Sequence, residues 1–279
     1  MQPNRCEEAR YFTAPVGAVE CLSATFHSYH YAPHAHDTFV IGALAHGTGG
    51  IFIRGRQHEA RADDLTLYNP HDVHDGSPRR DGFSYRVSYP SVSLIREIAS
   101  EGLGFDRAST PSFAAPIVHD PAGAALFLDA HRRWEAGCSA LEAEEALVHA
   151  YAYCLSRHAG IRFPVAGSEA GPVGKAVALL SDGFAERRTL DDLARAAGLP
   201  RQRLIRAFRR ATGFTPHAFL VNRRVDAAKD MLRRGADPLS VAMTTGFSDQ
   251  AHLNRIFKAR VGVTPGAFRA AFAGRDVRH

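Results

Sequence analysis

Two kinds of hydrophobic pattern divide this chain. From Val19 to about Tyr89, short runs rich in Val, Ile, Phe and Thr alternate with Gly, Pro, Asp and Asn, as in TFVIGALAHG and DLTLYNP. Such runs are typical of antiparallel strands separated by turns. Beyond about residue 120, hydrophobic residues recur every three or four positions, which is the period of an α-helix. The pattern predicts an α+β chain with an N-terminal β-barrel or sandwich and a helical C-terminal part.

Three helices are predicted after the strands. Ser91–Ser100 forms a short one, and Ala122–Ala136 and Ser139–His158 form a pair of longer ones, the second capped by Ser139. Thr110–Pro116 between them is expected to be a loop. The helix pair packs on the barrel or forms a dimer interface, and the pattern leaves both open. Residues 1–16, which are polar, are expected to form an arm over the barrel.

The last hundred residues contain one pattern twice. The first copy runs Leu190–Phe219 and the second Leu239–Phe268, and both end in G-x-T-P-x-x-F. Gly213 matches Gly262 at an offset of 49 residues. Each copy predicts a short helix, a turn at a glycine and a second helix. One such copy also fits an ordinary helical hairpin with a solvated basic face, but two copies at one offset favour paired DNA-binding units.

The second helix of each copy has an apolar inner face and a basic or amide outer face. Leu204 and Phe208 lie inside in the first copy, and Leu253 and Phe257 in the second. Arg pairs in a bidentate manner with guanine, and Gln or Asn pairs with adenine. The outer positions are Gln202, Ile205, Arg206, Arg209, Arg210, Gln250, Asn254, Arg255 and Lys258.

These segments resemble the AraC/XylS family of transcription regulators. AGLPRQRLIRAFRRATGFTPHAFL is similar to the family's first DNA-binding motif and GFSDQAHLNRIFKARVGVTPGAFR to its second. The resemblance covers about Val173 to Arg269. It implies two helix-turn-helix units joined by a long helix, about Pro216 to Arg234, whose recognition helices enter successive segments of the major groove.

Carried over position by position, the resemblance also implies which residues contact DNA. Ile205 stands where some members carry a polar base-reading residue, and it suits contact with a thymine methyl group. The outward Arg209 and Lys258 complete the expected set. The base-reading candidates are Arg201, Gln202, Arg206, Gln250, Asn254 and Arg255.

The charge is unevenly distributed. Residues 172–279 carry 20 Lys and Arg against 9 Asp and Glu, a net charge of +11, whereas residues 1–171 carry 14 against 20, a net charge of −6. A basic half is expected of a domain that binds nucleic acid. Attraction between an acidic and a basic domain is the alternative.

Length and composition fit two soluble domains. The chain has 279 residues, of which 45% are hydrophobic and 23% charged. We expect an effector-binding and dimerisation domain over 1–160, a Gly-, Pro- and Ser-rich linker over 161–172 and a DNA-binding domain over 173–279. No leader pattern and no apolar stretch near 18 residues is present, so a cytoplasmic protein is expected. The cysteines lack C-x-x-C spacing, which disfavours zinc ribbons and disulfides.

The strand-rich part resembles the small cupin barrel that AraC-type regulators carry as an effector-binding domain. The likeness lies in YAPHAHDTFVIGALAHGTGGIFIRGRQHEARADDLTLYNPHDVHDG. It places the effector inside the barrel, where imidazole and phenol groups favour a small polar or aromatic molecule. Core packing is the competing explanation for the aromatic residues. Strand parity, the alternation of side chains between the two faces of a strand, gives the candidate effector-binding residues His34, His36, Phe39, Tyr68, His74 and Tyr89.

Three of these histidines are also candidate metal ligands. Cupin enzymes hold a metal with an H-x-H pair, a carboxylate a few residues later and a further histidine. The resemblance supplies His34, His36 and His74, but Val40 and Ile41 occupy the carboxylate positions. Three imidazoles can still hold a divalent ion such as Zn²⁺ with an open fourth position. Alternatively, the histidines form hydrogen bonds inside the barrel or to an effector, so no cofactor is certain.

Two functions are compatible with these patterns. The first is a ligand-responsive regulator, which the resemblance makes an activator; its expected partners are promoter DNA, a small-molecule effector, a second copy of the chain and, by analogy, RNA polymerase. The alternative is a metal-dependent cupin enzyme with a helical appendage. The missing carboxylate argues against it, as does the lack of a nucleophile motif, a phosphate-binding glycine loop or H-E-x-x-H. We therefore expect a regulator and not an enzyme.

Overall fold

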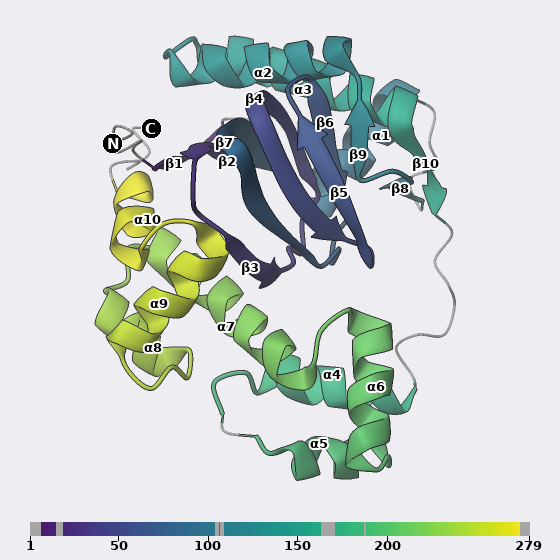
Figure 1. Cartoon of the computed structure of the whole chain (residues 1–279), viewed down its shortest axis with the longest axis vertical. Coiled ribbons are helices and arrows are strands. Elements are labelled where there is room, and N and C mark those ends of the chain that lie inside the picture. Colours follow the sequence, from purple (N-terminus) through teal and green to yellow (C-terminus); the bar gives the residue numbers. More distant parts are fainter. Residues whose placement is uncertain are drawn as a thin grey trace. The chain divides into compact units, whose positions relative to one another are not determined.

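The structure is a computed structural model of the chain, and it describes residues 7–14, 19–103, 106, 109–162, 171–186 and 188–273. The chain divides into two compact units, residues 1–164 and 165–279, and each unit is described by itself (Figure 1). Within the described residues, the first unit contains every strand and the second unit is entirely helical. The predicted two-domain α+β organisation, with antiparallel strands first and helix-turn-helix units second, is confirmed.

Eight antiparallel strands of the first unit form one sheet. Along the path of the sheet the order is β1-β2-β7-β4-β6-β9, with β3 paired to β7 and β5 paired to β4. The remaining two strands, β8 and β10, form a small separate sheet. The strands are β1 Glu8–Thr13, β2 Glu20–Phe26, β3 Tyr31–His34, β4 Val40–Ile53, β5 Arg56–Arg61, β6 Asp64–Tyr68, β7 His74–Tyr89, β8 Thr110–Phe113, β9 Ile117–His119 and β10 Ala159–Arg162.

The two long strands, β4 and β7, pair with each other and bend together. Their register shifts near Gly47, where Gly47 has φ +78° and Gly82 opposite has φ +92°. A Cβ atom at Gly47 would collide with the carbonyl oxygen of Gly82. Glycines at such irregularities allow a strand to kink. Because of the bend, β4 pairs with β6 through its first residues and with β5 through its last ones.

Helices α1 (Val92–Leu103), α2 (Pro121–Glu135) and α3 (Ala140–His158) belong to the same unit. The apolar faces of α2 and α3 bury Phe127, Leu147 and other side chains in one core with the sheet. Packing within the unit, one of the two roles left open for this helix pair, is therefore observed. Ser139 caps α3 by accepting a hydrogen bond from the N–H of Glu142, as predicted.

Three expectations from the sequence need correction. Thr110–Pro116 is not all loop, because Thr110–Phe113 is strand β8, and Ile161 and Arg162, expected in the linker, belong to its partner β10. The arm also contains a strand, since β1 pairs with β2 and the indole N–H of Trp134 donates to the carbonyl of Thr13 at 2.9 Å. These strands are only four to six residues long, so the pattern concealed them. Most of the expected linker, residues 163–170, lies outside the described part.

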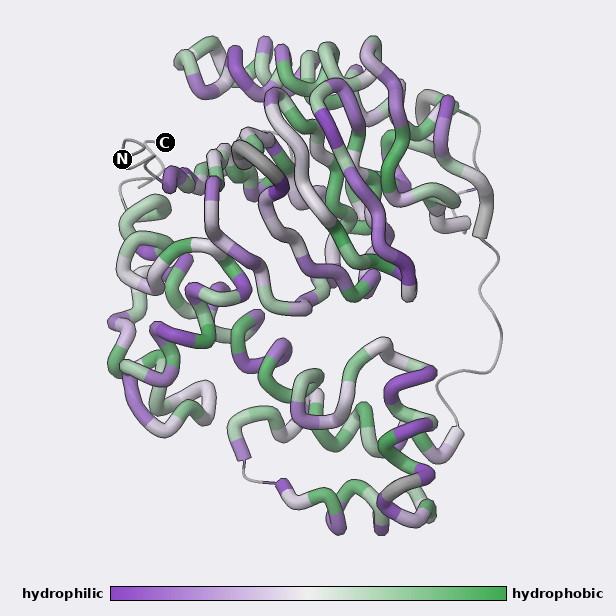
Figure 2. Tube along the Cα trace, in the orientation of Figure 1, coloured by the Kyte–Doolittle hydropathy of each residue, from purple (hydrophilic) through white to green (hydrophobic). Residues whose placement is uncertain are grey.

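The second unit contains two three-helix groups around the long helix α7, the predicted connector (Figure 1). Figure 2 shows hydrophobic and hydrophilic residues alternating along these helices, as one buried face and one exposed face require. No helix in the described ranges is both long and apolar enough to cross a membrane. The helices are α4 Pro172–Asp182, α5 Leu190–Ala197, α6 Arg201–Thr212, α7 Pro216–Arg233, α8 Pro238–Thr244, α9 Gln250–Val261 and α10 Pro265–Phe272.

Candidate DNA interface and effector pocket

The G-x-T-P-x-x-F segment folds in the same way in both repeats. Gly213 ends α6 with φ +76° and Gly262 ends α9 with φ +90°, a left-handed conformation that favours glycine. Thr215 and Thr264 then cap α7 and α10, each accepting a hydrogen bond from the backbone N–H three residues later. The sequence motif is therefore a helix stop followed at once by a helix start.

Aromatic contacts fix each recognition helix to the helix that follows it. Phe208 of α6 meets Phe219 of α7 edge-on, with ring centroids 5.4 Å apart. Phe257 of α9 meets Phe268 of α10 in the same manner at 5.5 Å. Phe208, Phe257 and Phe268 have no exposed surface. These contacts orient α6 and α9 with their apolar faces inward, as the pattern predicted.

The predicted DNA-contacting residues lie on the outer faces of α6 and α9. Arg201, Arg206 and Arg209 of α6 are exposed, as are Gln250, Arg255 and Lys258 of α9. Ile205 and Asn254 are half-buried on the same faces. Gln202 belongs to α6, but its side chain lies outside the described part of the structure. Residues four apart share one side of a helix, so each set can face a groove together.

One candidate in the first repeat already has an acidic partner. The guanidinium of Arg201 forms an ion pair with Asp191 of α5, and this bond holds the pKa of the Asp191 carboxyl below its usual value. Across the described residues, no acidic side chain lies within ion-pair distance of Arg255 in the second repeat. Arg201 is therefore already bound to an acidic partner, whereas Arg255, among the described residues, is not.

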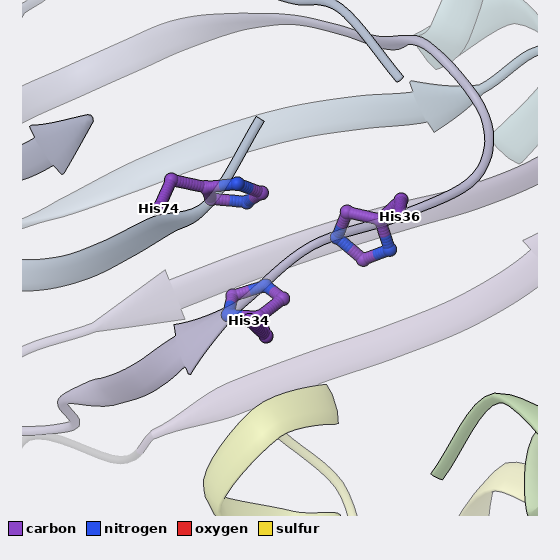
Figure 3. Close-up of side chains that lie close together, drawn as sticks. All are labelled: His34, His36 and His74. Atoms are coloured by element: carbon purple, nitrogen blue, oxygen red, sulfur yellow. The ribbon is translucent and has the colours of Figure 1, made fainter. Parts of the chain in front are cut away.

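The three candidate histidines of the first unit converge. His34 ends β3 and lies opposite His74, the first residue of β7, in the antiparallel register. His36 follows two residues after β3. The ring centroids lie 4.4 Å apart for His34 and His74, 5.0 Å for His34 and His36, and 5.4 Å for His36 and His74. Figure 3 shows the three rings gathered around one space.

Two predicted tyrosines border this cluster. The ring of Tyr68 lies 4.6 Å from that of His74, and the ring of Tyr89 lies 4.8 Å from that of His36. Burial raises the pKa of both phenols and lowers the pKa of His74. The tyrosines and His74 are consequently uncharged near neutral pH, and they can donate or accept hydrogen bonds to a bound molecule.

Phe39, the remaining effector candidate, lies elsewhere. It is fully buried in the core shared by the sheet and the helices, where its ring meets Phe113 edge-on at 5.9 Å. Val40 and Ile41, at the positions of the cupin carboxylate, are buried in β4. The structure therefore brings five of the six candidates together, while Phe39 serves packing.

Sequence reasoning missed two further tyrosines beside the cluster. The hydroxyls of Tyr31 and Tyr85 lie 2.8 Å apart, and the Tyr31 ring lies 5.6 Å from that of His34. The alternation of FSYRVSY, which turns Phe83, Tyr85 and Tyr89 to one face of β7, was a usable signal for Tyr85. A register shift between Tyr31 and His34 breaks the alternation of β3, so strand parity gave no signal for Tyr31.

The loop that carries His74 is braced from several sides. The side chain of Asn69 donates to the carbonyl of Phe113 and accepts from its N–H, at 3.0 and 2.8 Å. The carboxylate of Asp72 accepts from the Asn69 N–H at 2.8 Å and from the Arg54 guanidinium at 2.7 Å. These hydrogen bonds hold in place the turn that leads to His74.

Comparison with known proteins agrees with the division into two units. Residues 16–151 match the family of AraC-like ligand binding domains, and residues 193–271 match a family of helix-turn-helix domains. The transcriptional regulator YbfI of Bacillus subtilis (strain 168) is 28% identical over 223 residues, which are 79% of this chain and 80% of that one. The transcriptional activator RhaS of Escherichia fergusonii is 32% identical over 101 residues, or 36% and 35% of the two chains.

A solved structure shares the whole fold. ToxT from Vibrio cholerae O395 aligns over 96% of this chain and 98% of its own, with a TM-score of 0.55 and 12% identity. The twin helix-turn-helix geometry, the ligand-binding domain match and the named relatives lead to one assignment. The chain belongs to the AraC family of DNA-binding transcription regulators, with its ligand-binding domain ahead of its helix-turn-helix domain.

Proposed function

We propose that this chain activates transcription in response to a small molecule, by binding promoter DNA through α6 and α9. The observation that carries the proposal is the repeated helix-turn-helix. In each repeat a left-handed glycine ends the recognition helix in the same way, and the helix carries Arg, Gln or Asn on its outer face. Side chains of these types pair with base edges in the major groove. The net charge of +11 over residues 172–279 supplies attraction to phosphates.

DNA binding is tested on the full chain by fluorescence anisotropy with duplexes from upstream of neighbouring transcription units. We expect tighter binding to one such duplex than to random DNA, and a steep loss of affinity with salt. The double variant Arg206→Ala/Arg255→Ala should abolish the preference. Arg56→Ala, which removes an exposed arginine from β5, is the matched control. Equal affinity of the unmodified chain for all duplexes would refute sequence-specific binding.

The effector is proposed to bind among the histidines and tyrosines of the first unit. A ligand alters DNA binding only if the two conformational states have different affinities for it. Thermal-shift screening of polar and aromatic metabolites, with each hit retested for its effect on DNA affinity, identifies the molecule. Tyr85→Phe and Tyr89→Phe should weaken the response to a hit without altering DNA affinity in its absence.

We further propose that the active form is a homodimer in which the outer faces of α2 and α3 meet. Leu141, at the start of α3, is 66% exposed and lies away from the core. A symmetric dimer would present paired DNA-binding units. Sedimentation velocity should give a dimer, and Leu141→Glu should shift it toward monomer. A monomer at tens of micromolar, with and without effector, contradicts this arrangement.

Activation requires RNA polymerase as a further partner. In run-off transcription from a bound promoter, the chain should raise transcript yield, and the double variant Arg206→Ala/Arg255→Ala should not. A decrease in transcript yield would instead identify a repressor.

A further inference from the structure

The histidine cluster of the first unit has the donor set of a metal centre. Suitable nitrogen atoms of His34, His36 and His74 all lie within 4.8 Å of one another. We propose that these three residues hold one divalent transition-metal ion of the Zn²⁺ class, and that the anionic group of the effector completes its coordination. Coordination of the ion by the effector rests on the proposed effector response, whereas metal binding by the three histidines does not.

The hydrogen bonds behind two of the rings select the form that binds metal. Nδ1 of His34 lies 2.8 Å from the carbonyl oxygen of Ala32, and Nδ1 of His74 lies 2.9 Å from that of Asp72. A carbonyl oxygen only accepts, so each Nδ1 carries the hydrogen and each neutral ring has its lone pair on Nε2. Metal-binding histidines typically have such a partner on the second ring nitrogen, because it fixes the tautomer and the ring direction.

The backbone holds these ligands near one another before any ion binds. His34 and His74 are direct cross-strand neighbours, and the N–H of His71 donates to the carbonyl of His36 at 2.7 Å. Tetrahedral zinc with bonds of about 2.0–2.1 Å separates its nitrogen ligands by about 3.3 Å. The three nitrogen atoms, which all lie within 4.8 Å of one another, would therefore move closer together when an ion binds.

The charge of this donor set predicts the class of the remaining ligand. Among the described residues, the cluster contains three imidazoles and no carboxylate, and buried Val40 and Ile41 stand where a cupin has one. Three neutral imidazoles contribute no negative charge to a divalent ion in a site where His34 and His74 are buried. Asp72 and Asp75 act on His74 only from outside the donor set. An isolated buried charge is costly, so an anion is favoured at the open position.

The surroundings suit a small carboxylate. The rings of Tyr68 and Tyr89 flank His74 and His36, and their hydroxyl groups can donate hydrogen bonds to carboxylate oxygens. Tyr31 and Tyr85 extend the aromatic wall beside His34. An effector with a carboxylate on an apolar or aromatic body would therefore bind the ion through its charged end and the tyrosine wall through its body.

Metal binding is tested directly on the full chain. After treatment with a chelator, the protein is dialysed against Zn²⁺ or Co²⁺, and bound metal is measured by plasma mass spectrometry. We expect about one equivalent, and for Co²⁺ the visible absorption of a site with fewer than six ligands. Less than a tenth of an equivalent would overturn the metal site.

Variants separate ligation from folding. His36→Ala should lose the metal, whereas His36→Asp, which keeps a donor atom, should retain it with a changed Co²⁺ spectrum. His46→Ala is the matched control, because His46 is exposed on β4 outside the cluster. Circular dichroism verifies that each variant is folded. Unchanged metal content in folded His36→Ala would assign the metal to another site and refute the proposal.

The open position is probed with acetate. Titration of the Co²⁺-loaded chain should change its visible absorption in a saturable manner, and Tyr89→Phe should weaken acetate binding. A spectrum that acetate leaves unchanged would refute the anion-binding half. DNA affinity is measured separately, with and without Zn²⁺. If the chain binds metal but shows no specific DNA binding, only the proposed function is refuted. If the chain binds specific DNA but binds no metal, only this inference is refuted.

Discussion

The two helix-turn-helix repeats share their turns but not their surroundings. A Cβ atom at Gly198, in the turn of the first repeat, would meet nothing within 4 Å. At Gly246, the matching position of the second repeat, it would lie 2.6 Å from the carbonyl oxygen of Ala185, which follows α4. The turn glycine is thus unobstructed in the first copy and packs against the backbone after α4 in the second.

The largest expected effect tests what the repeats have in common. Phe208→Ala and Phe257→Ala each remove a fully buried ring that contacts the next helix, so each should lower the free energy of unfolding by about 3–5 kcal/mol. Urea unfolding followed by far-UV circular dichroism measures this cost. Trp134, the only tryptophan, lies in the first unit, and its fluorescence transition is the internal control. If only one of the two variants lost stability, the two repeats would not be equivalent in how they pack.

The turn glycines test the difference. Alanine in a left-handed conformation costs about 1–2 kcal/mol at either position. Gly246→Ala should cost about 1–3 kcal/mol more than Gly198→Ala, because only its Cβ is crowded by backbone. The same unfolding experiment compares them. Equal costs for the two variants would show that the contact with Ala185 has no energetic weight.

The recognition helices should differ in how much one arginine contributes. Arg255→Ala should reduce the preference for specific over random DNA by about 1–3 kcal/mol, the range of one good bidentate contact. Arg201→Ala should reduce it less, because Arg201 must first leave Asp191. Anisotropy titrations measure both. In an Asp191→Ala background, the effect of Arg201→Ala should grow; if it does not, the ion pair has no bearing on DNA binding.

The helix caps predict the smallest effect, a difference in pH dependence. Asp237 and Asp249 cap α8 and α9 in the second repeat, and hydrogen bonds from the backbone N–H groups of Ser240 and His252 lower the pKa of these carboxyls. The pKa of each carboxyl is lower in the folded chain than in the unfolded chain, so the ionised cap stabilises the fold at pH values above the ordinary pKa of aspartate. This stabilisation is lost as the pH falls through the lowered pKa.

Melting temperatures from pH 6 to pH 3 measure this effect. Asp249→Asn keeps the cap without its titration, so its melting temperature should fall less on acidification. Pro200 offers no side-chain cap to α6, so Pro200→Ala should leave the acid sensitivity unchanged. Identical acid profiles for Asp249→Asn and the unmodified chain would contradict the assignment.

Features determined by neighbouring residues were predictable from the sequence. Gly213 and Thr215 define a helix end and a helix start with no help from the rest of the fold, and the buried positions of Leu204 and Phe208 follow from helical period. The partnership of His34 with His74 was suggested by the cupin resemblance. Strand parity alone could not have given it, because it depends on how β3 pairs with β7.

Features that depend on distant packing were not predictable. The bulge that turns Tyr31 toward His34 and the contact of Gly246 with Ala185 both arise from elements remote in sequence. Phe39 has the residue type of a pocket but the position of a core residue, and only the path of the chain separates the two. The ion pair of Arg201 with Asp191 likewise needs the angle between α5 and α6.

One side chain in the middle of α7 has a consequence for the promoter. The Arg224 guanidinium donates to the carbonyls of Phe184 and Glu186 at 2.8 and 3.2 Å, on the same stretch of backbone that Gly246 contacts. Both recognition helices are therefore mounted on one stiff support. Five base pairs inserted between their two targets would turn the second target by about half a revolution, out of reach of α9. Spacing, and not base identity alone, should decide which promoters respond.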